Sequence, residues 1–347
     1  MRKGIELIER LSLAFGPSGC EGEVAALICE ELAGLPVELT YDRMGNLTAH
    51  LPGPVGAPRV LLSAHMDEVG FMITEIEKKG FLRFSTLGGI DPRVMVGRPV
   101  TLGDESKRVC GVISCKGIHF QNAEERGKTP ELKDMYIDIG VGDKDAVERF
   151  VSLGDFGTFD TKFLPLGKDG EFISGKALDD RVGCAVLIEV LRAVASEALP
   201  LDLYFAFTVR EELGISGATV VANRVAPDIA FVIETTAMAD LPDVPAARRV
   251  ADMGKGGVLS LLDRATIYDR ALIDLALEVG AREGIPVQVK RFVSGGNDAK
   301  HVQRSGKGVR CLALSAPTRY LHAPVSVASR RDIESMIALL HALLGAL

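Results

Sequence analysis

The 347-residue sequence contains no tryptophan, and only 5% of its residues are aromatic. Stacking platforms for bases and sugars are therefore scarce. An excess of basic residues is also lacking, since 40 Lys and Arg face 47 Asp and Glu, which gives a formal net charge of −7. Proteins that bind nucleic acid usually carry a basic stripe. We therefore expect no nucleic-acid partner.

Long apolar runs are missing as well. No stretch approaches the ~20 residues of a membrane-spanning helix, and Glu6, Glu9 and Arg10 interrupt the apolar core that a signal peptide would need. The six cysteines form no Cys-x-x-Cys pair, which favours reduced and buried thiols. They are Cys20, Cys29, Cys110, Cys115, Cys184 and Cys311. We expect a cytoplasmic protein without a membrane partner, and a chain of this length can be stabilised by its hydrophobic core alone.

Helical and strand-like patterns alternate at both ends of the chain. Ser18 and Glu21 have the Ser-x-x-Glu spacing of a capping box, which predicts a helix that ends near Leu32. Short apolar runs predict buried strands at residues 60–64, 201–209, 229–233 and 309–314. Helical periodicity predicts helices at residues 5–13, 181–195, 268–282 and 331–344. Such alternation is typical of an α/β fold with a largely parallel sheet flanked by helices.

The middle of the chain has a different pattern. Between residues 70 and 166, Gly, Asp and Pro divide short strand-like pieces, and no long amphipathic helix is present. The predicted strands lie at residues 71–76, 81–85, 94–102, 109–114, 135–139 and 156–163. We therefore predict an α/β domain over residues 1–67 and 166–347, with a small all-β domain inserted at residues 68–165.

Histidines and acidic residues follow the predicted buried strands. In open α/β sheets, ligands bind beyond the carboxyl ends of the strands. The candidates are His65 and Asp67 after the first strand, Glu211 and Glu212 after the second, Glu234 after the third, His322 after the fourth, and Asp179 before a helix. Imidazole and carboxylate ligands suit zinc and related metals, and a two-metal site can activate water and polarise a carbonyl. Taken singly, each residue has an ordinary alternative as a solvated, capping or structural side chain.

The order of these motifs resembles the M42 metallo-aminopeptidases, the family of glutamyl aminopeptidases and TET-type peptidases. The resemblance extends over nearly the whole chain. Its motifs are GPSG at residues 16–19, HMD at 65–67, ALDDR at 177–181, EELG at 211–214, ETT at 234–236, GGNDA at 295–299 and RYLHAP at 319–324. It implies the phosphorylase/hydrolase-like fold of di-zinc peptidases, in which residues 1–67 and 166–347 form the catalytic domain. Residues 68–165 would form a β-barrel-like domain for oligomerisation and access.

The resemblance also implies a role for each site residue. Asp179 would bridge two divalent ions, zinc in the first instance and cobalt or manganese as alternatives. His65 and Glu234 would complete one ion, and Glu212 and His322 the other. Glu211 would be the general base that takes a proton from the attacking water. Asp67 would accept a hydrogen bond from the His65 ring, and the peptide bond between Asp179 and Asp180 is expected to be cis.

This chain departs from the usual family pattern at three positions. Glu234 stands where many members have Asp, which can alter metal spacing or affinity. Ala323 replaces a Ser, and Asn297 replaces a Thr. The last two are not ligands, so only the expected substrate contacts change.

The activity implied by the resemblance is removal of the N-terminal residue from peptides with a free N-terminus, by a homo-oligomer that is expected to be a dodecamer. A related di-metal amidohydrolase, such as a deacylase or a carboxypeptidase-like enzyme, would use the same ligands. A glycoside hydrolase is disfavoured because the adjacent Glu211 and Glu212 rarely present two carboxyls across one glycosidic bond. A non-catalytic assembly protein would not need Glu211.

Overall fold

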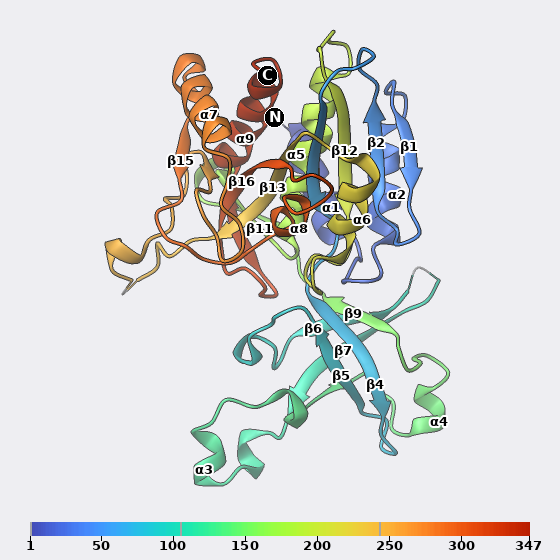
Figure 1. Ribbon diagram of the computed structural model, residues 1–347. Helices are drawn as coiled ribbons and strands as arrows, with labels where there is room; N and C mark the ends of the chain where they lie inside the picture. The colour runs from blue at the N-terminus through green and yellow to red at the C-terminus, as the bar shows by residue number, and fades with distance from the viewer. Residues whose placement is uncertain (1, 105, 243) are drawn as a thin grey trace.

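The computed structural model describes residues 2–104, 106–242 and 244–347. It has two parts, an α/β body and a β-barrel that extends from one end of it (Figure 1). The chain leaves the body after strand β3, completes the barrel, and returns to the body through β10 and β11. No helix in the described residues is long and apolar enough to cross a membrane.

A mixed eleven-stranded sheet forms the centre of the body. Four neighbouring strands run parallel in its middle: β12 (Asp202–Thr208), β3 (Arg59–His65), β13 (Ile229–Ala237) and β16 (Arg310–Arg319). Antiparallel strands extend both edges, and β14 and β15 form a branch beside β16. These strands are β1 (Glu38–Tyr41), β2 (Leu47–Leu51), β17 (Ser326–Ser329), β11 (Phe172–Gly175), β10 (Leu164–Leu166), β14 (Gly257–Leu259) and β15 (Val287–Val289).

The prediction of a largely parallel sheet was therefore wrong at the edges, although the four central strands match it. The edge strands have three to five residues and are partly exposed, so they lack the continuous apolar run that marks a buried strand.

Helices cover both faces of this sheet. The described residues contain α1 (Arg2–Leu13), α2 (Gly22–Leu32), α5 (Leu178–Val194), α6 (Ser216–Val225), α7 (Arg270–Glu283), α8 (Ala299–Val302) and α9 (Arg330–Leu344). Helix α5 packs against β3, β13, α1 and α9, and it is buried almost all round, as expected for a helix in the centre of a layered fold. Helices α6 and α8 contact each other and pack against the central strands.

The barrel is closed in the order β4-β5-β8-β7-β6-β9. Its strands are β4 (Gly70–Ile76), β5 (Leu82–Leu87), β6 (Pro99–Gly103), β7 (Arg108–Cys115), β8 (Met135–Asp138) and β9 (Phe156–Phe159), and its one-turn helices are α3 (Ala123–Arg126) and α4 (Lys144–Val147). It has its own apolar core, in which Phe71 makes edge contacts with Phe84 and Phe159. The predicted small all-β element is thus present as a barrel. The domain boundaries at residues 68 and 165 stay a prediction.

Two local predictions were wrong. Residues 94–102 are not one strand, because a 3₁₀ turn over Pro92–Val94 precedes β6 and Gly97 has a left-handed φ of 82°. Ser18 and Glu21 do not form a capping box, since α2 begins at Gly22 without a side-chain cap. Both side chains bond instead to segments that are distant in sequence.

Candidate metal centre

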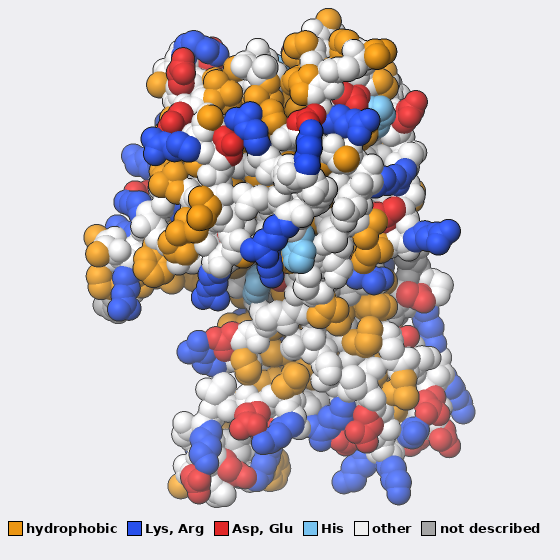
Figure 2. Space-filling model, in the orientation of Figure 1, with side chains coloured by type: hydrophobic (Ala, Val, Ile, Leu, Met, Phe, Trp, Pro, Cys, Tyr) orange, Lys and Arg blue, Asp and Glu red, His pale blue; other side chains and the backbone are white. Residues whose placement is uncertain are grey.

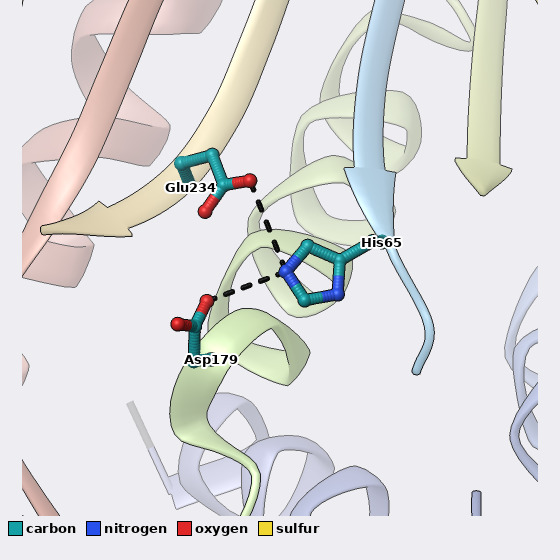
Figure 3. A group of neighbouring side chains, drawn as sticks. All are labelled: His65, Asp179 and Glu234. Carbon is teal, nitrogen blue, oxygen red and sulfur yellow. Dashed lines mark ion pairs between the residues drawn. The ribbon is translucent and has the colours of Figure 1, made fainter. Parts of the chain in front are cut away.

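The carboxyl ends of the central strands bring the predicted site residues together. His65 is the last residue of β3, Glu211 and Glu212 follow β12, and His322 follows β16. Glu234 lies within β13. Asp179 lies in the first turn of α5, and Figure 3 shows the His65 ring between the carboxylates of Asp179 and Glu234. Parallel strands end at one edge of the sheet, which explains how four distant segments reach one site, and the start of α5 adds Asp179.

Two groups of candidate ligands share the carboxylate of Asp179. On one side, Nε2 of His65 lies 3.3 Å from Asp179 Oδ1 and 3.8 Å from Glu234 Oε1. On the other side, Nε2 of His322 lies 3.5 Å from Asp179 Oδ2 and 3.1 Å from Glu212 Oε1. Each oxygen of Asp179 thus faces a different histidine, which is the arrangement needed to bridge two ions.

The donor atoms fit divalent cations. Ligand atoms lie within 4.8 Å of one another in the groups His65–Asp179–Glu234 and Asp179–Glu212–His322, and also among His65, Glu211 and Glu212. Oδ1 of Asp179 is buried and has no hydrogen-bond partner in the part of the chain that the structure describes. A buried carboxylate oxygen without a donor is costly unless a cation or another donor satisfies it. The residues therefore suit transition metals that accept nitrogen and oxygen ligands.

The other ring nitrogens are held by backbone carbonyls. Nδ1–H of His65 donates to the carbonyl oxygen of Asp67 at 3.1 Å, and the Asp67 carboxylate lies at 3.4 Å. Nδ1–H of His322 donates to the carbonyl oxygen of Gly89 at 3.0 Å. Such bonds leave Nε2 free as an acceptor for metal. The predicted link between His65 and Asp67 is present, but the backbone oxygen is the nearer partner.

The barrel supplies a contact that the sequence did not reveal. Gly88 and Gly89 follow β5, and they approach Glu212 and His322. Gly88 has a φ of 83°, and a Cβ atom there would lie 2.8 Å from Val69 Cγ1 and 3.3 Å from Glu212 Cβ. Only glycine fits both the backbone angle and the space. Because glycines are frequent in this segment, no sequence signal distinguishes this pair.

Asp67 joins several parts of the site. Its side chain is fully buried and accepts hydrogen bonds from the backbone N–H groups of Glu211 (2.9 Å) and Glu212 (3.1 Å) and from the hydroxyl of Ser18 (2.7 Å). Burial raises the pKa of Asp67, but its bonds with His65, Ser18 and the Glu211 N–H outweigh burial and lower the pKa below its usual value. Asp67 is thus a buried anion that fixes the Glu211–Glu212 backbone.

The electrostatics of the site reflect crowded carboxylates. Burial raises the pKa values of Glu211 and Glu234 well above normal, and neighbouring carboxylates add to this effect. Burial lowers the pKa of His322, but its contacts with Asp179 and Glu212 outweigh burial and raise the pKa to about 11. Excess negative charge in a buried site favours cations.

The segment that carries Asp179 has an unusual backbone. Ala177 has a left-handed φ of 51°, and the Asp179–Asp180 peptide bond is cis, as predicted. Two buried cations support this segment. Lys176 donates to Glu68 Oε1 at 2.6 Å, and Nε–H of Arg181 donates to the carbonyl oxygen of Met66 at 2.6 Å.

The GGNDA motif reaches the same end of the sheet. The hydroxyl of Thr208, at the end of β12, donates to Asp298 Oδ2 at 2.7 Å. Asn297 contacts the hydroxyl of Tyr268, which also donates to Asp263 at 2.6 Å. The motif therefore packs behind the turn that bears Glu211.

Comparison with known proteins places this chain among the M42 aminopeptidases. The sequence model of the M42 glutamyl aminopeptidase family matches residues 45–339 of this chain. A putative aminopeptidase of Escherichia coli, FrvX, is 33% identical over 99% of this chain and 95% of its own. The chain belongs to the M42 aminopeptidase family.

Solved structures agree with this assignment. A TET aminopeptidase from the archaeon Thaumarchaeota archaeon SCGC AB-539-E09 has a TM-score of 0.95 and 35% identity, with 99% of this chain and 96% of that chain covered. The TET1 peptidase of Pyrococcus horikoshii, which can assemble into a tetrahedron or a large octahedral shell, has a TM-score of 0.88 and 34% identity. The match covers 98% of this chain and 99% of that chain.

Proposed function

We propose that this protein is a di-metal aminopeptidase that removes the N-terminal residue from peptides. The observation that carries the proposal is the Asp179 carboxylate, whose two oxygens face separate histidines at 3.3 and 3.5 Å. His65 and Glu234 would hold one ion, Glu212 and His322 the other, and Asp179 both. Zinc is the first candidate, with cobalt and manganese as alternatives. When bound, such ions polarise the scissile carbonyl and lower the pKa of the attacking water.

Glu211 is the proposed general base. It directly precedes a proposed ligand, Glu212, and shares a cluster with Glu212 and His65. Its carboxylate would take a proton from the attacking water and transfer it to the leaving amine. Burial raises the pKa of Glu211, and a higher pKa makes its carboxylate a stronger base. The surrounding carboxylates would also attract the positively charged N-terminus of a peptide.

We further propose that residues 68–165 serve assembly and access in a homo-oligomer, with a dodecamer as the expected form. Ile118 and Phe120 on this insertion are 60% and 78% exposed, unusually high for large apolar residues. Figure 2 shows basic and acidic side chains mixed with apolar ones over this part of the molecule. The assemblies described for the Pyrococcus horikoshii peptidase support the proposal. Light scattering that shows a stable, metal-loaded monomer would exclude it.

The activity is tested with a panel of aminoacyl reporter substrates on metal-stripped protein, to which zinc, cobalt or manganese is added back singly. The proposal expects activity only with metal and only on a free α-amine, so the Nα-acetylated form of the best substrate is the matched control. Preference for acylated or C-terminal substrates would indicate the related amidohydrolase. Cleavage of a polysaccharide in the presence of chelator would indicate a glycoside hydrolase.

A further inference from the structure

The loop between α1 and α2 lies directly against the strand end that carries His65. The backbone N–H of Ser18 donates to the carbonyl oxygen of Glu68 at 3.1 Å. The N–H of Glu68 in turn donates to the carbonyl oxygen of Gly16 at 3.0 Å. Pro17 and Glu68 thus form a parallel bridge. The side chains of Ser18 and Glu21 are buried, with 1% and 7% exposure.

Ser18 acts on the site through Asp67. Its hydroxyl donates to Asp67 Oδ2 at 2.7 Å, on the carboxylate that accepts the N–H groups of Glu211 and Glu212. The hydroxyl therefore fixes the orientation of the acceptor on which both glutamates depend.

Glu21 binds the backbone of Arg210, the residue that precedes Glu211 in the same turn. Its Oε1 accepts hydrogen bonds from the backbone N–H groups of Gly19 (2.7 Å) and Arg210 (3.1 Å). Arg210 has a left-handed φ of 56°, a backbone angle that is unfavourable for a residue with a Cβ and needs support from its surroundings. Together, Glu21 and Asp67 accept the N–H groups of three consecutive residues, 210, 211 and 212.

We propose that Ser18 and Glu21 are positioning residues, which hold the turn at residues 210–212 so that Glu211 and Glu212 point into the site. This inference rests on the roles proposed for Glu211 and Glu212. It assigns to the loop a task that local sequence does not suggest, because the Ser-x-x-Glu spacing resembles a helix cap. Neither Ser18 nor Glu21 belongs to the clusters of candidate metal ligands among the described residues.

The test uses Ser18→Ala and Glu21→Ala in the full-length, metal-replete protein. A displaced catalytic group loses up to about 100-fold in rate, so we expect kcat to fall about 10- to 100-fold with little change in KM. Loss of a residue that supports a metal ligand typically weakens metal binding about 10- to 100-fold. Calorimetric titration of the stripped variants with Co²⁺ should therefore show weakening of the ion bound by Glu212. Glu21→Gln keeps the acceptor oxygen and should retain nearly the parent kcat.

Two matched controls lie away from the site. Ser335 is a buried serine that accepts the N–H of Gly257 at 2.8 Å, and Asp332 is a buried carboxylate that accepts the N–H groups of Gly254 (2.7 Å) and Gly256 (2.6 Å). Ser335→Ala and Asp332→Ala should lower thermal stability without changing kcat or cobalt affinity per folded chain. Circular dichroism fixes the folded fraction of each variant.

The proposal is overturned if folded Ser18→Ala and Glu21→Ala match the parent in kcat and cobalt affinity, or if Glu21→Gln is as impaired as Glu21→Ala. A Glu211→Gln protein measured in parallel separates the two hypotheses. If that variant is fully active, the proposed role of Glu211 as general base fails. The cobalt titrations would still decide whether the loop positions Glu212.

Discussion

Replacing Glu211 with glutamine isolates the proposed proton transfer. The substitution keeps the size of the side chain, and its backbone N–H still donates to Asp67 Oδ1. The proposed ligands that cluster with Asp179 are His65, Glu212, Glu234 and His322, and all remain in place. Only the carboxylate that would accept the proton is lost.

The expected loss follows from general acid–base catalysis. A positioned base contributes about 10²- to 10⁴-fold to the rate, which corresponds to about 3–5 kcal/mol of activation free energy. We expect Glu211→Gln to lose at least about 10²-fold in rate. Its metal content and oligomeric state should be unchanged. KM should change little, because Glu211 is proposed to act on the water and not on the bound peptide.

Glu212→Gln is the matched comparison, since it changes the adjacent residue in the same way. Glu212 lies 3.1 Å from Nε2 of His322, in the proposed ligand group. This variant should bind metal more weakly, and added metal should partly restore its rate. The assay measures initial rates on a free-amine reporter together with bound metal by elemental analysis. If Glu211→Gln hydrolyses the reporter at the parent rate, Glu211 is not the base.

Three further predictions follow from the site and its supports. Asp179→Asn should reduce bound metal from about two ions to fewer than one, measured by elemental analysis after dialysis; retention of two ions would exclude bridging by this carboxylate. Gly88→Ala should lower metal affinity and kcat, whereas Gly56→Ala, with the same φ of 83° but nothing within 4 Å of its Cβ, should lower only stability; equal kcat in the two variants would contradict this. Burial and the nearby Asp67 raise the pKa of Glu21 from 4.5 to about 7, so the folded state favours the protonated acid. That stabilisation is complete below pH 4.5 and is lost as the pH rises through 7. In urea unfolding of metal-free protein, Glu21→Gln should therefore gain up to about 3 kcal/mol on the parent between pH 4.5 and pH 8, and parallel curves would refute it.

The central part of the fold was predictable because its strands are buried on both faces. The runs at residues 60–64, 201–209, 229–233 and 309–314 are mostly apolar, and all four lie in the parallel centre of the sheet. The edge strands were missed because they have only three to five residues, and most of them contain partly exposed positions. Helix α6 (Ser216–Val225) was missed because it is short and its buried face consists of Gly, Ala and Val, which give little helical signal in the sequence.

The clustering of His65, Glu212, Glu234 and His322 was predictable for a similar reason, since residues at the carboxyl ends of neighbouring parallel strands lie at one edge of the sheet. Their roles as metal ligands, and that of Asp179, were implied by the family resemblance and stay a prediction. The supports of the site were not predictable. Ser18 and Glu21 fit a local capping pattern, but their side chains bond to Asp67 and to the Arg210 backbone, which are distant in sequence, and not to the start of the helix. Lys176 and Gly88 act through residues more than 100 positions away, and no spacing rule links such pairs.

The most direct measurement of the central claim is anomalous diffraction from crystals of zinc-loaded protein, with data collected on both sides of the zinc absorption edge. The account predicts two peaks per chain, one between Asp179, His65 and Glu234 and the other between Asp179, Glu212 and His322. A single peak, or two peaks that do not share Asp179, would contradict it.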